Sequence, residues 1–148
     1  MRRLSAGMLI CAVTLSASSE DPPKSLYHRV GGYDVIASLV DAWQARVGKD
    51  PRFARFGGTR SQGSRRRGRQ QTVELLCQAA GGPCFYVGPD MKAVHAGLGI
   101  GDELWQAQLT AFEEALDSLK VPAKEKQELM EIMAGWKGAV AERTKAPN

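Results

Sequence analysis

The chain has 148 residues, a formal net charge of +4 at pH 7 and a hydrophobic share of 43%. This length suits one domain with one hydrophobic core, and the composition excludes an intrinsically disordered chain. Because Arg2 and Arg3 supply two of the positive charges at the very start, the basic balance is weak evidence for a nucleic-acid partner.

The first residues have the order of a secretory signal peptide. Arg2 and Arg3 precede an apolar run over residues 4–15, and small residues follow over 16–19. The run is too short to span a bilayer, so we expect no stable membrane insertion of the mature chain. We predict a signal peptide over residues 1–18 and a folded domain over 19–148, with the alternative that the start is a disordered or weakly amphipathic extension. Cleavage would make the protein periplasmic or secreted, and without it the protein would be cytoplasmic.

Helical periodicity recurs along the remaining chain, and no run shows the alternation of a strand. It predicts a short helix over residues 25–30, a longer helix over 33–48, and a tight apolar corner at Phe53 and Phe56. Residues 57–68 carry glycine, serine and arginine without an apolar side chain, which indicates a loop or a poorly ordered entry to a helix over 69–80.

The second half continues the helical pattern. A loop through Pro89 leads to a short helix at His95. Asp102 then begins another helix, because an acidic group suits the first turn. The last predicted helix opens at Pro122 and its apolar seam reaches Val140, beyond which the tail from residue 145 is expected to fray. The predicted fold class is therefore all-α.

Two cysteines flank the end of the predicted helix over 69–80. Cys77 and Cys84 could form a disulfide in an oxidising compartment, provided that their Cα atoms lie within about 7 Å. Alternatively, Cys77 is a small core residue and Cys84 an idle thiol. Two thiols without a nearby histidine cannot complete a tetrahedral zinc site, so this pair is not expected to bind zinc.

An arginine cluster falls in the predicted loop and just after it. Its members are Arg60, Arg65, Arg66, Arg67 and Arg69. The cluster could bind phosphate or steer anions, but we favour a solvated, mobile loop. No aromatic residue lies among the arginines to stack on bases, so we predict no nucleic-acid partner.

One of the two histidines, His95, lies in an apolar turn. It follows Met91 by one helical turn, so the two side chains share a face. Such an imidazole is either a satisfied core histidine or a metal ligand. The run from Met91 to His95, the following residues 97–100 (GLGI) and the earlier residues 81–83 (GGP) together resemble the proximal segment of the group I truncated haemoglobins.

The resemblance covers about residues 26–140 and implies a shortened globin, with helices packed two over two around a haem. His95 would bind the iron through its outer ring nitrogen, with the inner nitrogen held by a backbone carbonyl. The cofactor would be haem b, one iron per chain, because no Cys-x-x-Cys-His motif exists for covalent attachment.

The resemblance also implies residues on the opposite side of the haem. Trp43 and Gln44 stand where the family has an aromatic pair ending in a tyrosine. Gln44 interrupts the apolar stripe of its helix, so it either faces a haem ligand as a buried amide or lies at the pocket rim bonded to water. Thr72 best matches the next inward polar position, and Gln71 is the second candidate.

Further cofactor contacts follow from the same resemblance. Phe56 would pack on the haem plane, and Lys92 would meet a haem propionate unless it is an ordinary solvent-facing lysine. Leu76, Tyr86, Met91 and Met133 would contact the cofactor. With less aromatic cover and no tyrosine donor, we expect a roomier pocket with faster oxygen loss and autoxidation.

The expected function is binding of oxygen, nitric oxide or related small ligands at the iron. A possible enzyme activity is nitric oxide dioxygenation, which requires a separate reductase because the chain has no flavin or nicotinamide motif. Oxygen transport, peroxidase-like chemistry and redox sensing remain open. The alternatives are a haem-free helical interaction domain derived from a globin, and a haem carrier.

Overall fold

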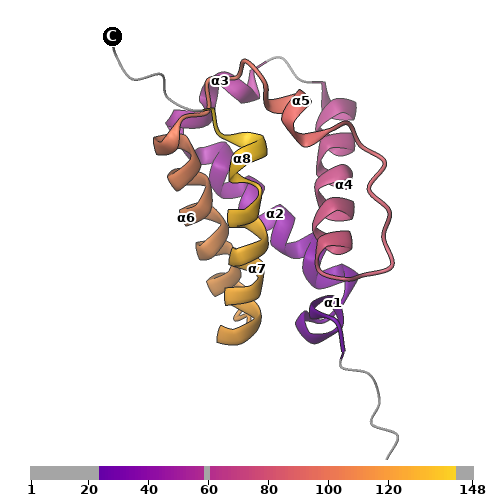
Figure 1. Cartoon of the computed structure of the whole chain (residues 1–148). Coiled ribbons are helices and arrows are strands. Elements are labelled where there is room, and N and C mark those ends of the chain that lie inside the picture. The colour runs from indigo at the N-terminus through magenta and orange to yellow at the C-terminus, as the bar shows by residue number, and fades with distance from the viewer. Residues whose placement is uncertain (1–23, 59–60, 143–148) are drawn as a thin grey trace, which may run out of the picture.

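The computed structural model describes residues 24–58 and 61–142, and every regular element in these ranges is a helix (Figure 1). The all-α prediction is therefore confirmed. The predicted signal peptide and the tail from residue 145 lie outside the described residues. Among the described helices, none combines the length and apolar character needed to cross a membrane.

The first two helices match their predicted ranges closely. α1 spans Leu26–Val30 and α2 spans Tyr33–Lys49. Gly31 and Gly32 separate them with φ angles of 109° and 82°, a region that glycine enters without steric cost. A short 3-10 helix, η1 at Pro51–Phe53, and α3 at Ala54–Gly57 form the apolar corner.

The prediction for residues 57–68 was wrong over most of its length. α4 spans Gln62–Ala79 and begins seven residues before the predicted start at 69. Ser61 caps it, because its hydroxyl oxygen accepts a hydrogen bond from the Ser64 amide at 3.1 Å. Arginine and glutamine are good helix formers, so the polar segment is an exposed first half of α4 rather than a loop.

The remaining helices are α5 (Met91–His95), α6 (Asp102–Ser118), α7 (Ala123–Gly135) and α8 (Lys137–Val140). The single predicted last helix is thus two elements, interrupted at Trp136. Glu142 donates its amide hydrogen to the Ile100 carbonyl at 2.8 Å, which ties the end of α8 to the segment after α5.

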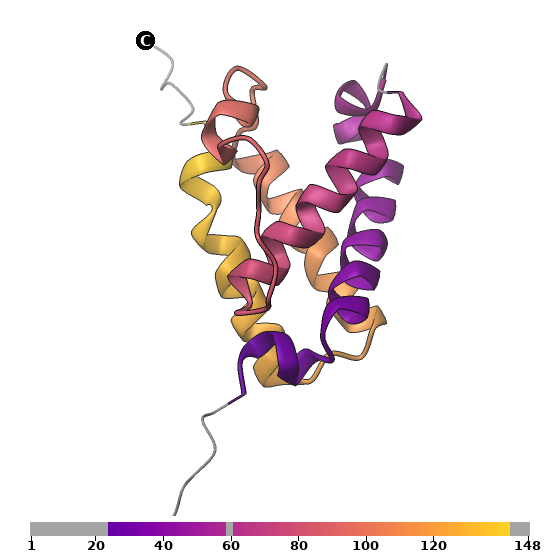
Figure 2. The same ribbon diagram turned by 90° about the vertical axis from the view of Figure 1, so that its right-hand side faces the viewer.

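Two helical pairs make the body of the molecule. α2 packs against α4, α6 packs against α7, and α2 joins the pairs by its contact with α6. The segment between α4 and α5 runs back along α4, so α5 lies at the opposite end of the molecule from α1 (Figures 1 and 2). There α5 contacts α8.

The buried side chains form two groups. The larger, called the main cluster, joins α1, α2, α4, α6 and α7, and its fully buried members include Ile36, Leu76 and Phe112. The smaller, called the second cluster, is built on Ile100, Trp105 and Val140 near α5 and α8. Leu109 and Trp136 contact both clusters and connect them.

An ion pair links the two helices that carry the predicted distal residues. The Arg69 guanidinium of α4 donates to both carboxylate oxygens of Asp41 on α2, at 2.5 and 2.7 Å. This hydrogen bonding lowers the pKa of Asp41 from its ordinary value of 3.8. Folding therefore favours the ionised carboxylate.

We expect Asp41→Asn to destabilise the protein at pH 6 by no more than about 1 kcal/mol, since the pair is solvent-exposed. Because the folded-state pKa is lowered, the stabilisation exists above the ordinary pKa and is lost as the pH falls through the folded-state value. Urea unfolding at pH 6 and pH 3 should show the difference from the wild type shrinking at pH 3. An undiminished difference would contradict the linkage.

Candidate functional site

α5 presents His95 with one ring nitrogen already engaged. The Asp90 side chain caps the helix by accepting a hydrogen bond from the Ala93 amide at 2.9 Å. His95 Nδ1 lies 2.7 Å from the Met91 carbonyl oxygen, which can only accept, so Nδ1 carries the hydrogen. In the neutral ring, Nε2 then keeps its lone pair for a metal ion. His95 is half-buried.

Hydrogen bonds from α3 hold the turn that follows His95. Arg55 of α3 donates to the carbonyl oxygens of Leu98 and Gly99 at 3.0 and 2.8 Å. Its guanidinium also lies 4.6 Å from the centre of the Phe56 ring. Gly99 has a φ of 64°, a left-handed conformation that glycine adopts readily. The segment after α5 is therefore held by side-chain contacts as well as by its own backbone.

Residues predicted to touch a cofactor fall into two places. Phe56 and Met91 pack against the second cluster near His95. Trp43, Leu76 and Met133 belong to the main cluster, in which Leu76 is 2% and Met133 1% exposed. The structure therefore brings Phe56 and Met91 together near His95 but places Leu76 and Met133 inside the core. Their contact with a cofactor stays a prediction.

Gln44 does not have the buried placement that the apolar stripe indicated. It is exposed, whereas Val40 one turn earlier is fully buried. The reason is its position on α2: Asp41 is one turn before Gln44 and pairs with Arg69, so this flank of α2 faces α4 and not the centre of the core. Whether Gln44 faces a haem ligand or lies at the pocket rim stays a prediction.

Trp43 has a buried polar atom without a partner. Its ring meets Phe112 edge-on, with 5.3 Å between the ring centres. Within the described part of the chain, the indole Nε1 is buried and makes no hydrogen bond. Buried N–H groups are normally paired, so the unpaired Trp43 Nε1–H is a candidate hydrogen-bond donor on the same helix as Gln44.

Thr72 and Gln71 lie on α4 and are half-buried. The Thr72 hydroxyl donates to the Gly68 carbonyl oxygen at 2.8 Å, one turn back in the helix. In this rotamer its hydrogen is used within α4, so Thr72 can accept but not donate to a ligand. No described residue forms a hydrogen bond with the Gln71 side-chain amide. Gln71 can therefore donate to a ligand, whereas the Thr72 hydroxyl cannot in this rotamer.

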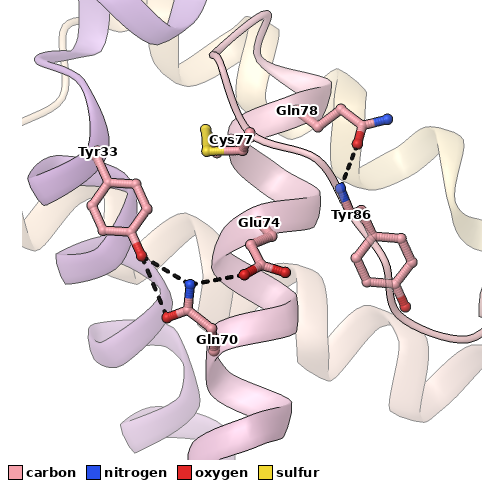
Figure 3. The surroundings of a disulfide bond; sticks show 7 residues. Tyr33, Gln70, Glu74, Cys77, Gln78 and Tyr86 are labelled. Atoms are coloured by element: carbon pink, nitrogen blue, oxygen red, sulfur yellow. Dashed lines mark hydrogen bonds between the residues drawn. A yellow bond between two sulfur atoms is a disulfide. The ribbon is translucent and has the colours of Figure 1, made fainter.

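Tyr86 and Lys92 flank the entry to α5. The Tyr86 amide donates to the Gln78 side-chain oxygen at 2.7 Å (Figure 3). Its hydroxyl donates to the Pro89 carbonyl at 2.7 Å. Burial, and then the negative charge of Asp90, raise the pKa of the Tyr86 phenol. The phenol thus stays protonated and keeps its bond to Pro89, while Lys92 is exposed on α5.

Gln108 is a polar residue on an inner face of α6 that was not predicted from the sequence. Gln108 lies one turn from both Trp105 and Phe112, which are 1% and 0% exposed. It is half-buried, and no described residue bonds its side chain. A glutamine inside the apolar pattern of α6 was the available signal. It is a further candidate donor between the two clusters.

One observation is the main support for the fit of these residues to a haem. Nδ1 of His95 is held by a backbone carbonyl and Nε2 is left as a metal donor, which is the arrangement of an iron-ligating imidazole. The core is also divided into two clusters, with His95 beside the second and unpaired polar groups on helices of the main one.

Comparison with known proteins gives consistent matches. The model of the bacterial-like globin family matches residues 25–142. The group 1 truncated hemoglobin GlbN of Mycolicibacterium paratuberculosis is 32% identical over 112 residues, covering 76% of this chain and 80% of the relative. GlbN of a Nostoc species is 29% identical over 117 residues, covering 78% of this chain and 96% of the relative.

The solved structures match in fold. The Fe(III) form of the truncated hemoglobin of Tetrahymena pyriformis superposes with a TM-score of 0.72 at 20% identity, over 81% of this chain and 100% of that one. The predicted two-over-two arrangement is therefore confirmed by fold similarity.

Proposed function

This chain belongs to the bacterial-like globin family, and we propose that it binds one haem b through His95 and takes oxygen, nitric oxide or related small ligands at the iron. The observation that carries the proposal is the fixed His95 ring, with Nδ1 bonded to the Met91 carbonyl at 2.7 Å and Nε2 free. When bound, haem supplies an iron with one coordination position open to a small ligand.

The chain's own residues orient and tune that group. The Met91 carbonyl sets the tautomer of His95 and raises its basicity as a ligand. Met91, one turn before His95, and Phe56 pack against the second cluster and add to its apolar surface. On the opposite side, the candidate donors are amides and an indole rather than a tyrosine hydroxyl.

Amide donors at a pocket rim give less stabilisation of a polar ligand than a preorganised buried donor. Gln44 is exposed and the Thr72 hydroxyl bonds within its own helix, so neither offers the donor that a buried tyrosine hydroxyl would supply. These placements support the expectation of fast oxygen loss and fast autoxidation. Fast oxygen loss and fast autoxidation suit a protein that converts its ligands better than one that stores oxygen.

We propose nitric oxide dioxygenation, in which nitric oxide, molecular oxygen and one electron give nitrate, as the reaction that such a pocket serves. It requires electrons from a separate reductase. A periplasmic or secreted location, which the first residues of the sequence predict, would set where that reductase acts. The Cys77–Cys84 disulfide supports an oxidising compartment, because such bonds persist there.

The test uses the haem-loaded, ferrous protein. We expect carbon monoxide and oxygen each to shift its absorption spectrum, and nitric oxide to be consumed repeatedly when an NADH-dependent flavoprotein reductase is added. Carbon monoxide, which occupies the open position, should stop consumption and is the matched control. A ferrous spectrum that no ligand changes would overturn ligand binding, and binding without repeated consumption would overturn the dioxygenase proposal alone.

A further inference from the structure

The Cys77–Cys84 disulfide joins the end of α4 to the segment that leads to His95. The two Cα atoms lie 5.8 Å apart. Cys77 is fully buried in the main cluster, whereas Cys84 is half-buried and packs against that cluster from the loop. Figure 3 shows the bridge at the point where the chain leaves α4 and turns back along it.

The start of this segment is closely packed. The Gly82 amide donates to the Cys77 carbonyl at 2.8 Å. A Cβ at Gly82 would lie 2.5 Å from the Tyr27 ring and 2.6 Å from Cys77 Sγ. Only glycine, which has no Cβ, fits this close approach. The Cys77 Sγ atom therefore packs tightly between the turn at Gly82 and Tyr27 of α1.

Beyond Cys84 the attachments become few. Phe85 and Val87 are each 83% exposed and contribute nothing to either cluster. Among the described residues, one hydrogen bond connects Tyr86 to α4, from its amide to the Gln78 side chain. The Tyr86 hydroxyl bonds Pro89 of the same segment and so adds no contact with α4. The disulfide is therefore the strongest attachment between α4 and the segment that carries α5.

We propose that the Cys77–Cys84 disulfide positions His95 and thereby sets how firmly the protein retains haem. Reduction by a dithiol breaks the S–S bond with two electrons and two protons, giving two thiols, while the dithiol becomes a disulfide. The segment between α4 and α5 then keeps the packing of Cys84 and its hydrogen bonds but loses its covalent attachment to α4. α5 still contacts α8, and we expect it to shift against α4 and change the orientation of the His95 ring. The inference rests on the proposed binding of haem at His95.

The experiment compares Cys84→Ala with Phe85→Ala in the full chain. Cys84→Ala removes the bridge but keeps the buried Cys77 sulfur in the core, whereas Phe85→Ala changes the next residue of the same segment, which is 83% exposed, and leaves both bridged cysteines in place. We expect transfer of ferric haem to excess apomyoglobin to be about tenfold faster from Cys84→Ala, the lower end of the range for groups that orient a metal ligand. Phe85→Ala should match the wild type.

A second readout separates positioning from general loss of stability. Resonance Raman spectra of the ferrous proteins should show a shifted or broadened iron–histidine stretching band for Cys84→Ala. Wild-type protein kept reduced with a dithiol during this measurement should behave like the variant. Unchanged transfer rates and an unchanged band would overturn the inference while leaving haem binding intact. Failure of the wild type itself to retain haem would overturn the proposed function and this inference with it.

Discussion

His95→Ala is expected to abolish stoichiometric haem binding, with affinity lowered by more than about 100-fold. Loss of a residue that merely orients a metal ligand costs about 10- to 100-fold, and here the ligand itself is removed. The imidazole is the group whose Nε2 is free and whose Nδ1 is fixed by Met91. Absorbance at the Soret band after gel filtration measures the retained haem.

His28→Ala is the matched control for this substitution. His28 is exposed on α1, and its Nδ1 lies 2.8 Å from the Ser25 hydroxyl oxygen. We expect this variant to retain haem like the wild type. Equal loss of haem from both variants, or full retention by His95→Ala with an unchanged spectrum, would contradict the assignment of His95 as the iron ligand.

Phe112→Ala is expected to lower the free energy of unfolding by about 3–5 kcal/mol, the range for removing a large aromatic side chain from a core. Phe112 is 0% exposed, lies in the main cluster, and makes the edge-on contact with Trp43. Denaturant unfolding followed by circular dichroism measures the change. A loss of this size is a large fraction of the roughly 5–15 kcal/mol that stabilises a typical domain.

Phe85→Ala makes the same chemical change at an exposed position. Phe85 is 83% exposed on the loop before α5, so its removal should change stability by no more than about 0.5 kcal/mol. If Phe112→Ala cost as little as Phe85→Ala, the main cluster would not be the stabilising core of this fold.

The apolar periodicity was sufficient to predict most helices. α2 and α6 have buried residues at the helical spacing, such as Ile36 with Val40 and Trp105 with Phe112. The range of α2 was predicted within one residue, and the start of α6 was predicted at Asp102, where it lies. The first half of α4 could not be found in this way. It is exposed, so no apolar side chain marks it, and Gly63 and Gly68 are typical of loops although the helix accommodates them.

The site could be predicted from the sequence in part. The His95 segment has a local pattern, and the backbone partner expected for its ring is the Met91 carbonyl one turn away. The distal side depends on the rotation of α2 and on rotamers, which periodicity does not fix. Asp41 and its partner Arg69 orient the flank that holds Gln44, and Thr72 bonds its own helix.

The disulfide shows a second limit of the sequence pattern. The spacing of Cys77 and Cys84 permitted either a bridge or two separate thiols. The deciding factor is the turn at residues 81–82, which reverses the chain and brings the two Cα atoms to 5.8 Å. Gly81 has a φ of 76°, a conformation that makes this tight reversal possible.

One haem is expected to bind at His95, and titration of the purified apoprotein with ferric haem measures this binding. We predict a Soret band that grows linearly, saturates at one haem per chain and persists through gel filtration. A titration without saturation, in a protein whose circular dichroism shows intact helices, would contradict this expectation. The fold would then serve as a haem-free helical domain.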